Sequence, residues 1–256
     1  MLGAMIGDIV GSIYEWHNIK TTDFRFFSDR CFFTDDTVLT AATAKALMTG
    51  VDYTRAYQDF ARRYPGRGYG GNFSHWIYAE NPKPYNSWGN GSAMRVSSVG
   101  FAFDTVEEVL AEAERSAVVT HNHPEGIKGA QSSALAILMA RQGATQTEIR
   151  KEITARFGYN LNRTLAEIRP EYTFDVSCQG SVPEAIIAFL ESEHYEDAIR
   201  KAISLGGDSD TIACITGGIA EAYYGLPDQI AVEGRTFLPE EFLQIIDDFH
   251  RWLIKP

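Results

Sequence analysis

Residues 206–225, with the sequence GGDSDTIACITGGIAEAYYG, combine the two patterns on which the interpretation of this chain rests. From Asp210 to Tyr224 the small and apolar residues recur at the spacing of an α-helix. Two glycines and the cluster Asp208-Ser209-Asp210-Thr211 stand at the expected start of that helix. The stretch therefore predicts a buried helix whose first turn carries carboxylates and hydroxyls.

Helical spacing also dominates the rest of the chain. It predicts helices over residues 36–49, 105–119, 124–142, 182–192, 195–204 and 239–253. Gly50 is a typical helix end, Pro124 is a typical first-turn residue, and residues 181–184 read as a capping box for the helix at 182–192. Convincing alternating strands are absent, and residues 17–34, 65–91 and 158–180 read as loops. These signals predict a compact all-α bundle.

Composition limits the classes of protein that fit. The 256 residues, of which 45% are hydrophobic, suit one folded domain over residues 1–256 and are too apolar for disorder. A formal charge of −11 argues against general nucleic-acid binding. Three widely spaced cysteines indicate a reducing compartment, not a disulfide scaffold or a zinc site. No apolar run reaches about 18 residues, so we expect a cytoplasmic protein without a membrane span.

A second acidic cluster, Thr34-Asp35-Asp36-Thr37, also precedes an apolar helix. Taken alone, either cluster is explained by helix capping, because acids and hydroxyls are favoured at helix N-termini. Two such clusters in one chain are better explained by a site for a hard cation such as Mg²⁺ or Mn²⁺, which prefers oxygen ligands.

Three further segments carry polar groups suited to a ligand. Residues 88–95, WGNGSAMR, place glycines before a helical run, where backbone N–H groups can hold an anion; a plain loop-to-helix turn is the alternative. In residues 120–126, THNHPEG, a third nitrogen or sulfur ligand for zinc is missing, so His123 or Asn122 is expected as a helix cap and His121 as a hydrogen-bonding group. Glu15 lies at the end of an apolar, small-residue helix and is exposed, paired or functional.

Together these segments resemble the ADP-ribosylglycohydrolase family, whose members include dinitrogenase reductase-activating glycohydrolase and the eukaryotic ADP-ribosylhydrolases. The matching motifs occur in the family's order: GDIVGSIYE (7–15), FTDDT (33–37), WGNGSAMR (88–95), THNHPEGIKGA (120–130), SVPEAI (181–186) and GGDSDTIACITGGIAEAYYG (206–225). The resemblance implies an all-α orthogonal bundle, two Mg²⁺ or Mn²⁺ ions, and hydrolysis of the glycosidic bond between ADP-ribose and an acceptor.

The resemblance also assigns roles to residues of this chain. The metal ligands that it implies are Thr34, Asp35, Asp36, Asp208, Asp210 and Thr211. The substrate-binding residues that it implies are Gly89, Asn90, Gly91, Ser92, Met94 and His121. The acid–base candidates are Asp35, which we favour, and Glu15, which also gates or supports the metal site. The chain departs from some relatives at residues 85–88, where no acidic residue precedes the glycine loop. Candidates for the wall that stacks on adenine are Tyr85, Trp88, Tyr172 and Phe174.

Two other functions compete with this interpretation. A non-catalytic ADP-ribose-binding or structural protein, like the jellyfish crystallins of the same family, would use the same scaffold, but all six metal-ligand positions here keep oxygen donors. A Mg²⁺ phosphatase with an aspartate nucleophile would need an α/β sheet, which the helical spacing contradicts. The expected partners are an ADP-ribosylated protein or small molecule and the product ADP-ribose, with a monomer as the default state.

Overall fold

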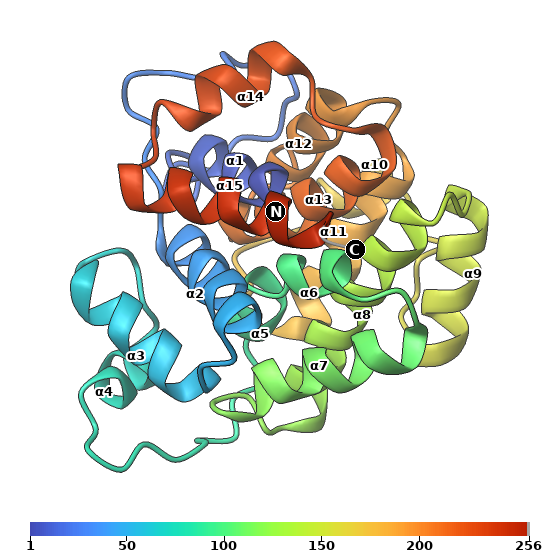
Figure 1. Cartoon of the computed structure of the whole chain (residues 1–256). Coiled ribbons are helices and arrows are strands. Elements are labelled where there is room, and N and C mark those ends of the chain that lie inside the picture. The colour runs from blue at the N-terminus through green and yellow to red at the C-terminus, as the bar shows by residue number, and fades with distance from the viewer. Residues whose placement is uncertain (255–256) are drawn as a thin grey trace.

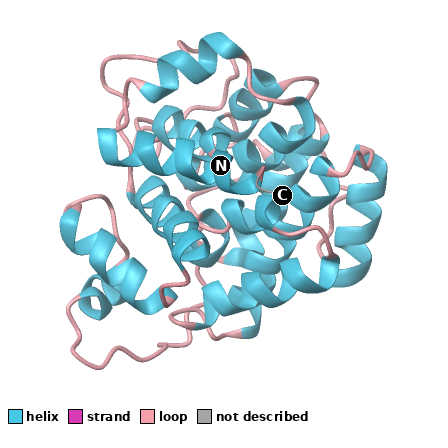
Figure 2. Cartoon of the chain, in the orientation of Figure 1, coloured by secondary structure: helices cyan, strands magenta, loops and turns pink. Residues whose placement is uncertain are grey.

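The structure is a computed structural model that describes residues 1–254, and within them every regular element is a helix (Figure 1, Figure 2). The all-α fold class is thereby confirmed. No helix in the described residues is both long and apolar enough to cross a membrane. The helices in chain order are α1 (Leu2–Gly11), α2 (Asp35–Thr49), α3 (Tyr53–Arg63), α4 (Gly71–Ile77), α5 (Gly91–Met94), α6 (Ser97–Ala102), α7 (Val106–Val118), α8 (Pro124–Arg141), α9 (Gln146–Phe157), α10 (Leu165–Ile168), α11 (Cys178–Leu190), α12 (Tyr195–Ile203), α13 (Ser209–Tyr224), α14 (Asp228–Arg235) and α15 (Glu240–Leu253).

The predicted end of α2 at Gly50 and start of α8 at Pro124 are confirmed, and a side chain caps the start of each helix. The Thr34 side chain accepts a hydrogen bond from the Asp36 amide at the start of α2, and Gly50 ends that helix with a left-handed φ of 69°. His123 caps α8 through its side chain, which accepts from the Glu125 amide, and Pro124 is the first residue of the helix. These helices therefore begin and end where local chemistry places them.

The predicted start of α11 is wrong. The helix begins at Cys178, four residues before the predicted start, with Ser177 as its cap. The Ser177 hydroxyl accepts from the Gly180 amide at 3.0 Å, so the capping role that we predicted for Ser181 belongs to Ser177. Pro183 consequently lies inside the helix. Its missing N–H leaves the carbonyl of Gln179 without the usual partner.

Two of the predicted loops contain helices that the sequence pattern did not reveal. The stretch 65–91 holds α4, and the stretch 158–180 holds α10 and the first turn of α11, whereas 17–34 is irregular throughout. Helices α3, α9 and α14 were also not predicted. In α9 only Ile149 and Ile153 are buried, so its apolar stripe is too thin to stand out from a polar sequence.

The centre of the bundle is a close crossing of α1 and α13, which lie against each other in the middle of the molecule (Figure 1). A Cβ atom placed on Gly7 would lie 2.1 Å from the carbonyl oxygen of Ala213, and one on Gly11 would lie 2.6 Å from the Cα of Asp210. Only residues without a side chain allow the two backbones to approach this closely. The crossing places the fully buried Asp8 of α1 beside the first turn of α13.

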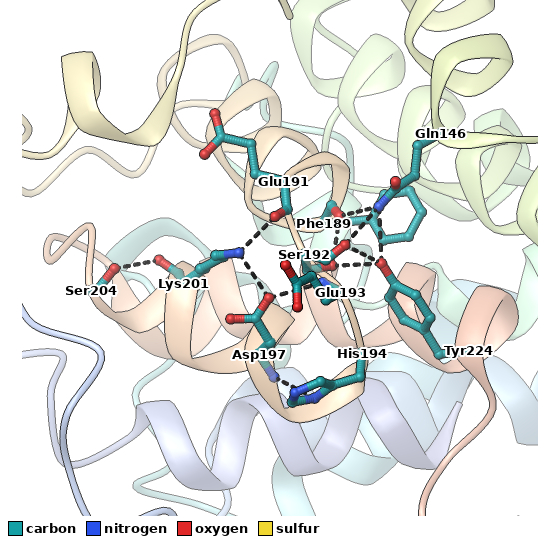
Figure 3. A network of polar contacts seen from close by, with 10 residues as sticks. All are labelled: Gln146, Phe189, Glu191, Ser192, Glu193, His194, Asp197, Lys201, Ser204 and Tyr224. Atoms are coloured by element: carbon teal, nitrogen blue, oxygen red, sulfur yellow. Dashed lines mark hydrogen bonds and ion pairs between the residues drawn. The ribbon is translucent and has the colours of Figure 1, made fainter.

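A polar network surrounds the turn between α11 and α12 and includes Tyr224 at the end of α13 (Figure 3). The Gln146 amide donates to the carbonyls of Phe189 and Ser192, each at 3.0 Å. The Lys201 ammonium donates to the Glu191 carbonyl at 2.6 Å. Side chains from α9 and α12 thus add hydrogen bonds to carbonyls at the end of α11 and in the turn after it.

The α1–α13 contact leads to a stability prediction. Gly7→Ala forces the two backbones apart, because the new methyl group meets a carbonyl that belongs to a helix and cannot rotate away. We expect a loss of about 3 kcal/mol in the free energy of unfolding, at the upper end of overpacking costs. Chemical denaturation followed by circular dichroism measures this loss.

Gly71→Ala is the matched control, because a Cβ at Gly71 meets nothing within 4 Å and its φ is not positive. We expect its stability to equal the wild-type value or slightly exceed it. Equal stabilities of Gly7→Ala and Gly71→Ala would contradict the close helix crossing.

Candidate metal and anion site

Acidic side chains from three parts of the fold converge on one cavity of about 580 Å³. Asp35 and Asp36 come from the start of α2, Asp208 and Asp210 from the start of α13, and Glu15 from the turn after α1. The two clusters that lie 172 positions apart in the sequence (36 to 208) are therefore neighbours in space. This juxtaposition is the geometry that a hard-cation site requires.

Asp8 is the acidic residue that the sequence analysis missed. Its carboxylate accepts hydrogen bonds from the amide and hydroxyl of Thr34, at 3.0 and 2.7 Å. It also accepts from the amide of Thr37, at 3.1 Å, and from the Thr37 hydroxyl. Asp8 thus fastens the start of α2 to α1. The signal that could have identified Asp8 is its position as the single acidic residue in the otherwise apolar segment 2–11.

The carboxylate oxygens form two overlapping groups. Oxygens of Asp8, Asp36 and Asp210 lie within 4.8 Å of one another, and so do oxygens of Glu15, Asp208 and Asp210. Asp210 belongs to both groups, as a carboxylate between two adjacent cations would. Asp35 belongs to neither group but lines the same cavity.

Burial and mutual repulsion raise the pKa values of these carboxyl groups. Burial raises the pKa of Asp8 to about 6, although its four hydrogen bonds oppose the shift. Burial and the charge of Asp208 raise the pKa of Glu15 to about 7. The pKa values of Asp36 and Asp210 lie well above the usual range, first through burial and then through neighbouring aspartates. Each carboxylate makes the ionisation of the others less favourable.

The residues present fit a divalent cation. None of the ion pairs found in residues 1–254 involves this cluster, so no lysine or arginine neutralises it there. The Oδ1 atom of Asp36 is buried without a hydrogen-bond partner. Buried charges are normally paired or bound to a metal. The oxygen-only donor set matches the preference of Mg²⁺ and Mn²⁺.

Asn18 holds the Glu15 turn against the segment that carries Asp208. Its side-chain amide donates to the carbonyls of Glu15 and Gly207, at 2.8 and 2.9 Å. Its side-chain oxygen accepts from the Gly207 amide at 2.9 Å. Gly206 and Gly207 both adopt positive φ angles, 74° and 76°, which the tight turn before α13 requires. The double glycine of the sequence thus positions the second acidic cluster.

The opposite wall of the cavity is the glycine loop that precedes α5. Gly89, Asn90, Gly91 and Met94 line the cavity, and so does His121 from the end of α7. The Asn90 side chain donates to Asp208 at 2.7 Å, so the loop is tied directly to the acidic cluster. Because Gly91 begins α5, its amide has no partner within the helix.

The other predicted site residues lie near the cavity in different ways. The Ser92 hydroxyl is buried and donates to the Gly126 carbonyl at 2.6 Å, so its side chain fastens the loop to α8. The Thr34 hydroxyl lies within hydrogen-bond distance of the carboxylates of Asp8 and Asp36, at 2.7 and 3.3 Å. The Thr211 hydroxyl donates to the Asp36 carboxylate at 3.3 Å. Tyr172 lies outside the cavity lining and donates to the Gly180 carbonyl.

Aromatic side chains line part of the cavity; Trp16, Trp88 and Phe174 are exposed, and Tyr85 is half-buried. Tyr85, Trp88 and Phe174, which the sequence analysis named as candidates for stacking, all line it. Trp16 was not named, although it follows Glu15 directly. It is 73% exposed and stacks on Phe174 with ring centroids 5.1 Å apart. A lining that combines aromatic side chains with a few polar groups is typical of a small-molecule site.

Comparisons with known proteins identify the family and the fold. The sequence model of the ADP-ribosylglycohydrolase family matches residues 1–253. The human and mouse proteins named ADP-ribosylhydrolase ARH3 are 29% and 28% identical to this chain; the alignments cover 90% and 88% of it and 85% and 83% of those proteins. The human alignment runs over 310 positions, more than the 256 residues of this chain, so the human protein contains inserted segments. A solved structure described as an ADP-ribosylglycohydrolase-related protein complex shares the fold, with a TM-score of 0.68 at 24% identity over 98% of this chain and 94% of that one.

The repulsion within the cluster leads to a second prediction. Asp36→Asn removes one buried charge, so in EDTA the variant should be about 1 to 2 kcal/mol more stable than the wild type. With Mg²⁺ or Mn²⁺ at 100 times its dissociation constant, the wild type should gain about 2.7 kcal/mol, and the variant should lose most of this gain. Thermal unfolding with and without metal measures both effects.

Asp23→Asn is the control for this prediction, because Asp23 is exposed and lies outside the cluster. It should keep the full metal-induced stabilisation. An Asp36→Asn protein that metal stabilises as strongly as the wild type would contradict the proposed ligand set.

Proposed function

Because the chain belongs to the ADP-ribosylglycohydrolase family, we propose that it hydrolyses the glycosidic bond between ADP-ribose and an acceptor and releases ADP-ribose. The acceptor is a protein side chain such as arginine or serine, or a small ADP-ribosylated molecule. Two Mg²⁺ or Mn²⁺ ions are the proposed cofactors. The single observation that carries the proposal is the meeting of the acidic cluster and the glycine loop across one cavity.

The metal ligands of this proposal are the six oxygen-bearing residues of the two acidic motifs, supplemented by Glu15. The sharing of Asp210 between the two carboxylate groups supports two adjacent cation positions. Bound cations would neutralise the carboxylates and act as Lewis acids toward substrate oxygens. Asp8, saturated by hydrogen bonds, is proposed to hold the ligands in place.

Asp35 is the proposed general base. It is half-buried, lines the cavity and stands outside both carboxylate groups. One of its two oxygens can therefore serve as a metal ligand at the edge of the cluster while the other contacts a water molecule. In the proposed reaction a water oxygen bonds to the anomeric carbon as the bond to the acceptor breaks. Asp35 takes the proton from water and returns it to the departing acceptor atom. The surrounding carboxylates favour the positive charge of an oxocarbenium-like transition state. Glu15 is the alternative base.

The glycine loop and His121 are the proposed anion-binding half of the site. ADP-ribose carries a diphosphate, and backbone amides can bind it although the chain as a whole is negative. The link from Asn90 to Asp208 fixes the spacing between the diphosphate and the hydrolysed bond. Tyr85, Trp88 and Phe174 supply aromatic faces for the adenine.

A non-catalytic protein on this scaffold is the competing function. It would bind ADP-ribose without turnover, and it would not need an acidic cluster that is costly to bury. The retention of oxygen donors at all six ligand positions supports the enzyme.

A continuous apolar core from α1 to α15 supports the proposal of one domain, and three free, buried cysteines support a cytoplasmic location.

The decisive assay is the release of ADP-ribose from defined acceptors, including arginine-linked and serine-linked ADP-ribose, with Mg²⁺, Mn²⁺ or EDTA. We expect turnover with metal and none with EDTA. Asp35→Asn should lower kcat by about 10²- to 10⁴-fold, the usual contribution of a general base, while ADP-ribose still binds. Asp23→Asn should keep wild-type kcat.

Two outcomes would count against the proposal at different levels. Full activity of Asp35→Asn with metal bound would transfer the role of base to Glu15. A wild-type protein that neither binds ADP-ribose nor releases it from any acceptor with either metal present would refute the proposed function.

A further inference from the structure

Arg95 is a fully buried cation beside the anion-binding half of the cavity. It forms no ion pair with a carboxylate in the described part of the chain, and its Nε and Nη1 atoms have no hydrogen-bond partner there. Its guanidinium lies over the ring of Tyr57, 4.1 Å from the centroid. Its Nη2 atom donates to the carbonyl of Ser116 at 3.1 Å and to the hydroxyl of Thr120 at 2.8 Å.

The contact with Arg95 determines what the Thr120 hydroxyl can do. An arginine side chain stays protonated and has only donors, so the Thr120 oxygen must accept this hydrogen bond. The hydroxyl has one hydrogen left to donate. The atoms in reach of it are Nδ1 of His121, at 2.7 Å, and the carbonyl of Ala117, at 3.5 Å.

Nδ1 of His121 is the better acceptor of the two. The Ala117 carbonyl already accepts the backbone amides of Thr120 and His121, at 3.1 and 2.8 Å. A third bond at 3.5 Å is at the limit of hydrogen-bond geometry, whereas 2.7 Å is a typical short contact for a hydroxyl. The hydrogen of Thr120 therefore lies on the Nδ1 side.

An Nδ1 atom that accepts a hydrogen bond leaves the proton of a neutral imidazole on Nε2. His121 is 5% exposed, and both burial and the nearby charge of Arg95 lower its pKa well below the usual value. The Nε2 edge faces the glycine loop. A Cβ atom on Gly91 would lie 3.1 Å from Nε2. The N–H group of His121 thus points to the wall where the diphosphate is expected.

We propose that Arg95 and Thr120 are positioning residues that lock His121 in its Nε2–H tautomer, so that it serves as a fixed neutral donor to the anionic ligand. The identity of that ligand as ADP-ribose rests on the proposed function above. The hydrogen bonds run from Arg95 through Thr120 to His121, because the guanidinium can only donate hydrogen bonds. Glycine at position 91 leaves room for the imidazole ring that these hydrogen bonds orient.

The first test reads the tautomer in the metal-loaded protein without ligand. Nitrogen-15 NMR of protein with labelled histidines distinguishes protonated from unprotonated ring nitrogens, and His121→Gln identifies the signals of His121. We expect Nε2 protonated and Nδ1 unprotonated between pH 6 and 8. A proton on Nδ1, or a cationic ring in this range, would overturn the inference, whether or not the protein binds ADP-ribose.

The second test compares Thr120→Ser with Thr120→Val. Serine keeps the hydroxyl, and we expect it to keep the single tautomer. Valine has a similar shape but no hydroxyl, so both tautomers of His121 should appear and the affinity for ADP-ribose should fall about tenfold. The signals of His123, which caps α8, should stay unchanged in both variants.

These outcomes separate the inference from the function on which it rests. A Thr120→Val protein that folds and keeps the pure Nε2–H tautomer would remove the role of Thr120. If the Thr120→Val protein does not fold, the tautomer of His121 in the wild type and in Thr120→Ser still tests the inference. Failure of the wild type to bind ADP-ribose, with Nε2 protonated, would refute the ligand and leave the tautomer lock standing.

Discussion

The backbone contact between α1 and α13 is the constraint on which the rest of the structure depends. Gly7 and Gly11 let the two helix backbones approach without intervening side chains, and this close approach places Asp8 at the first turn of α13. Asp8 then fastens Thr34 and the start of α2 through its hydrogen bonds. The three elements that carry the acidic cluster are therefore held by one helix crossing and one saturated carboxylate.

The same arrangement explains why an acidic protein can be expected to bind an acidic ligand. Most of the 34 acidic residues lie outside the cluster, whereas the cluster concentrates carboxylates that cannot all ionise without a counter-charge. Divalent cations would supply that charge. In the glycine-loop wall of the cavity, the groups that can hold an anion are backbone amides, the N–H group of neutral His121 and the charge of Arg95. The two halves of the site thus differ in charge, and Asn90 joins them.

Much of this could be predicted from the sequence, because the signals were local. The spacing of apolar residues predicted the fold class, and Gly50 and Pro124 marked helix ends correctly. The two acidic motifs were recognised by composition, and the structure brings them together. The features that the sequence did not predict depend on tertiary contacts. Ser177 replaced Ser181 as the cap of α11, Asp8 looked like one more residue of an apolar helix, and the role of Arg95 is visible only once Thr120 and His121 lie beside it.

The central claim is that the junction of α1, α2 and α13 is a binuclear divalent-cation site. The most direct test is anomalous diffraction from crystals of the protein grown with Mn²⁺. The account predicts two anomalous peaks on the cavity floor, one at coordination distance from Asp36 and one from Asp208, with Asp210 between them. A cavity floor without any anomalous peak at saturating Mn²⁺, or with peaks bound only by surface acids, would contradict it.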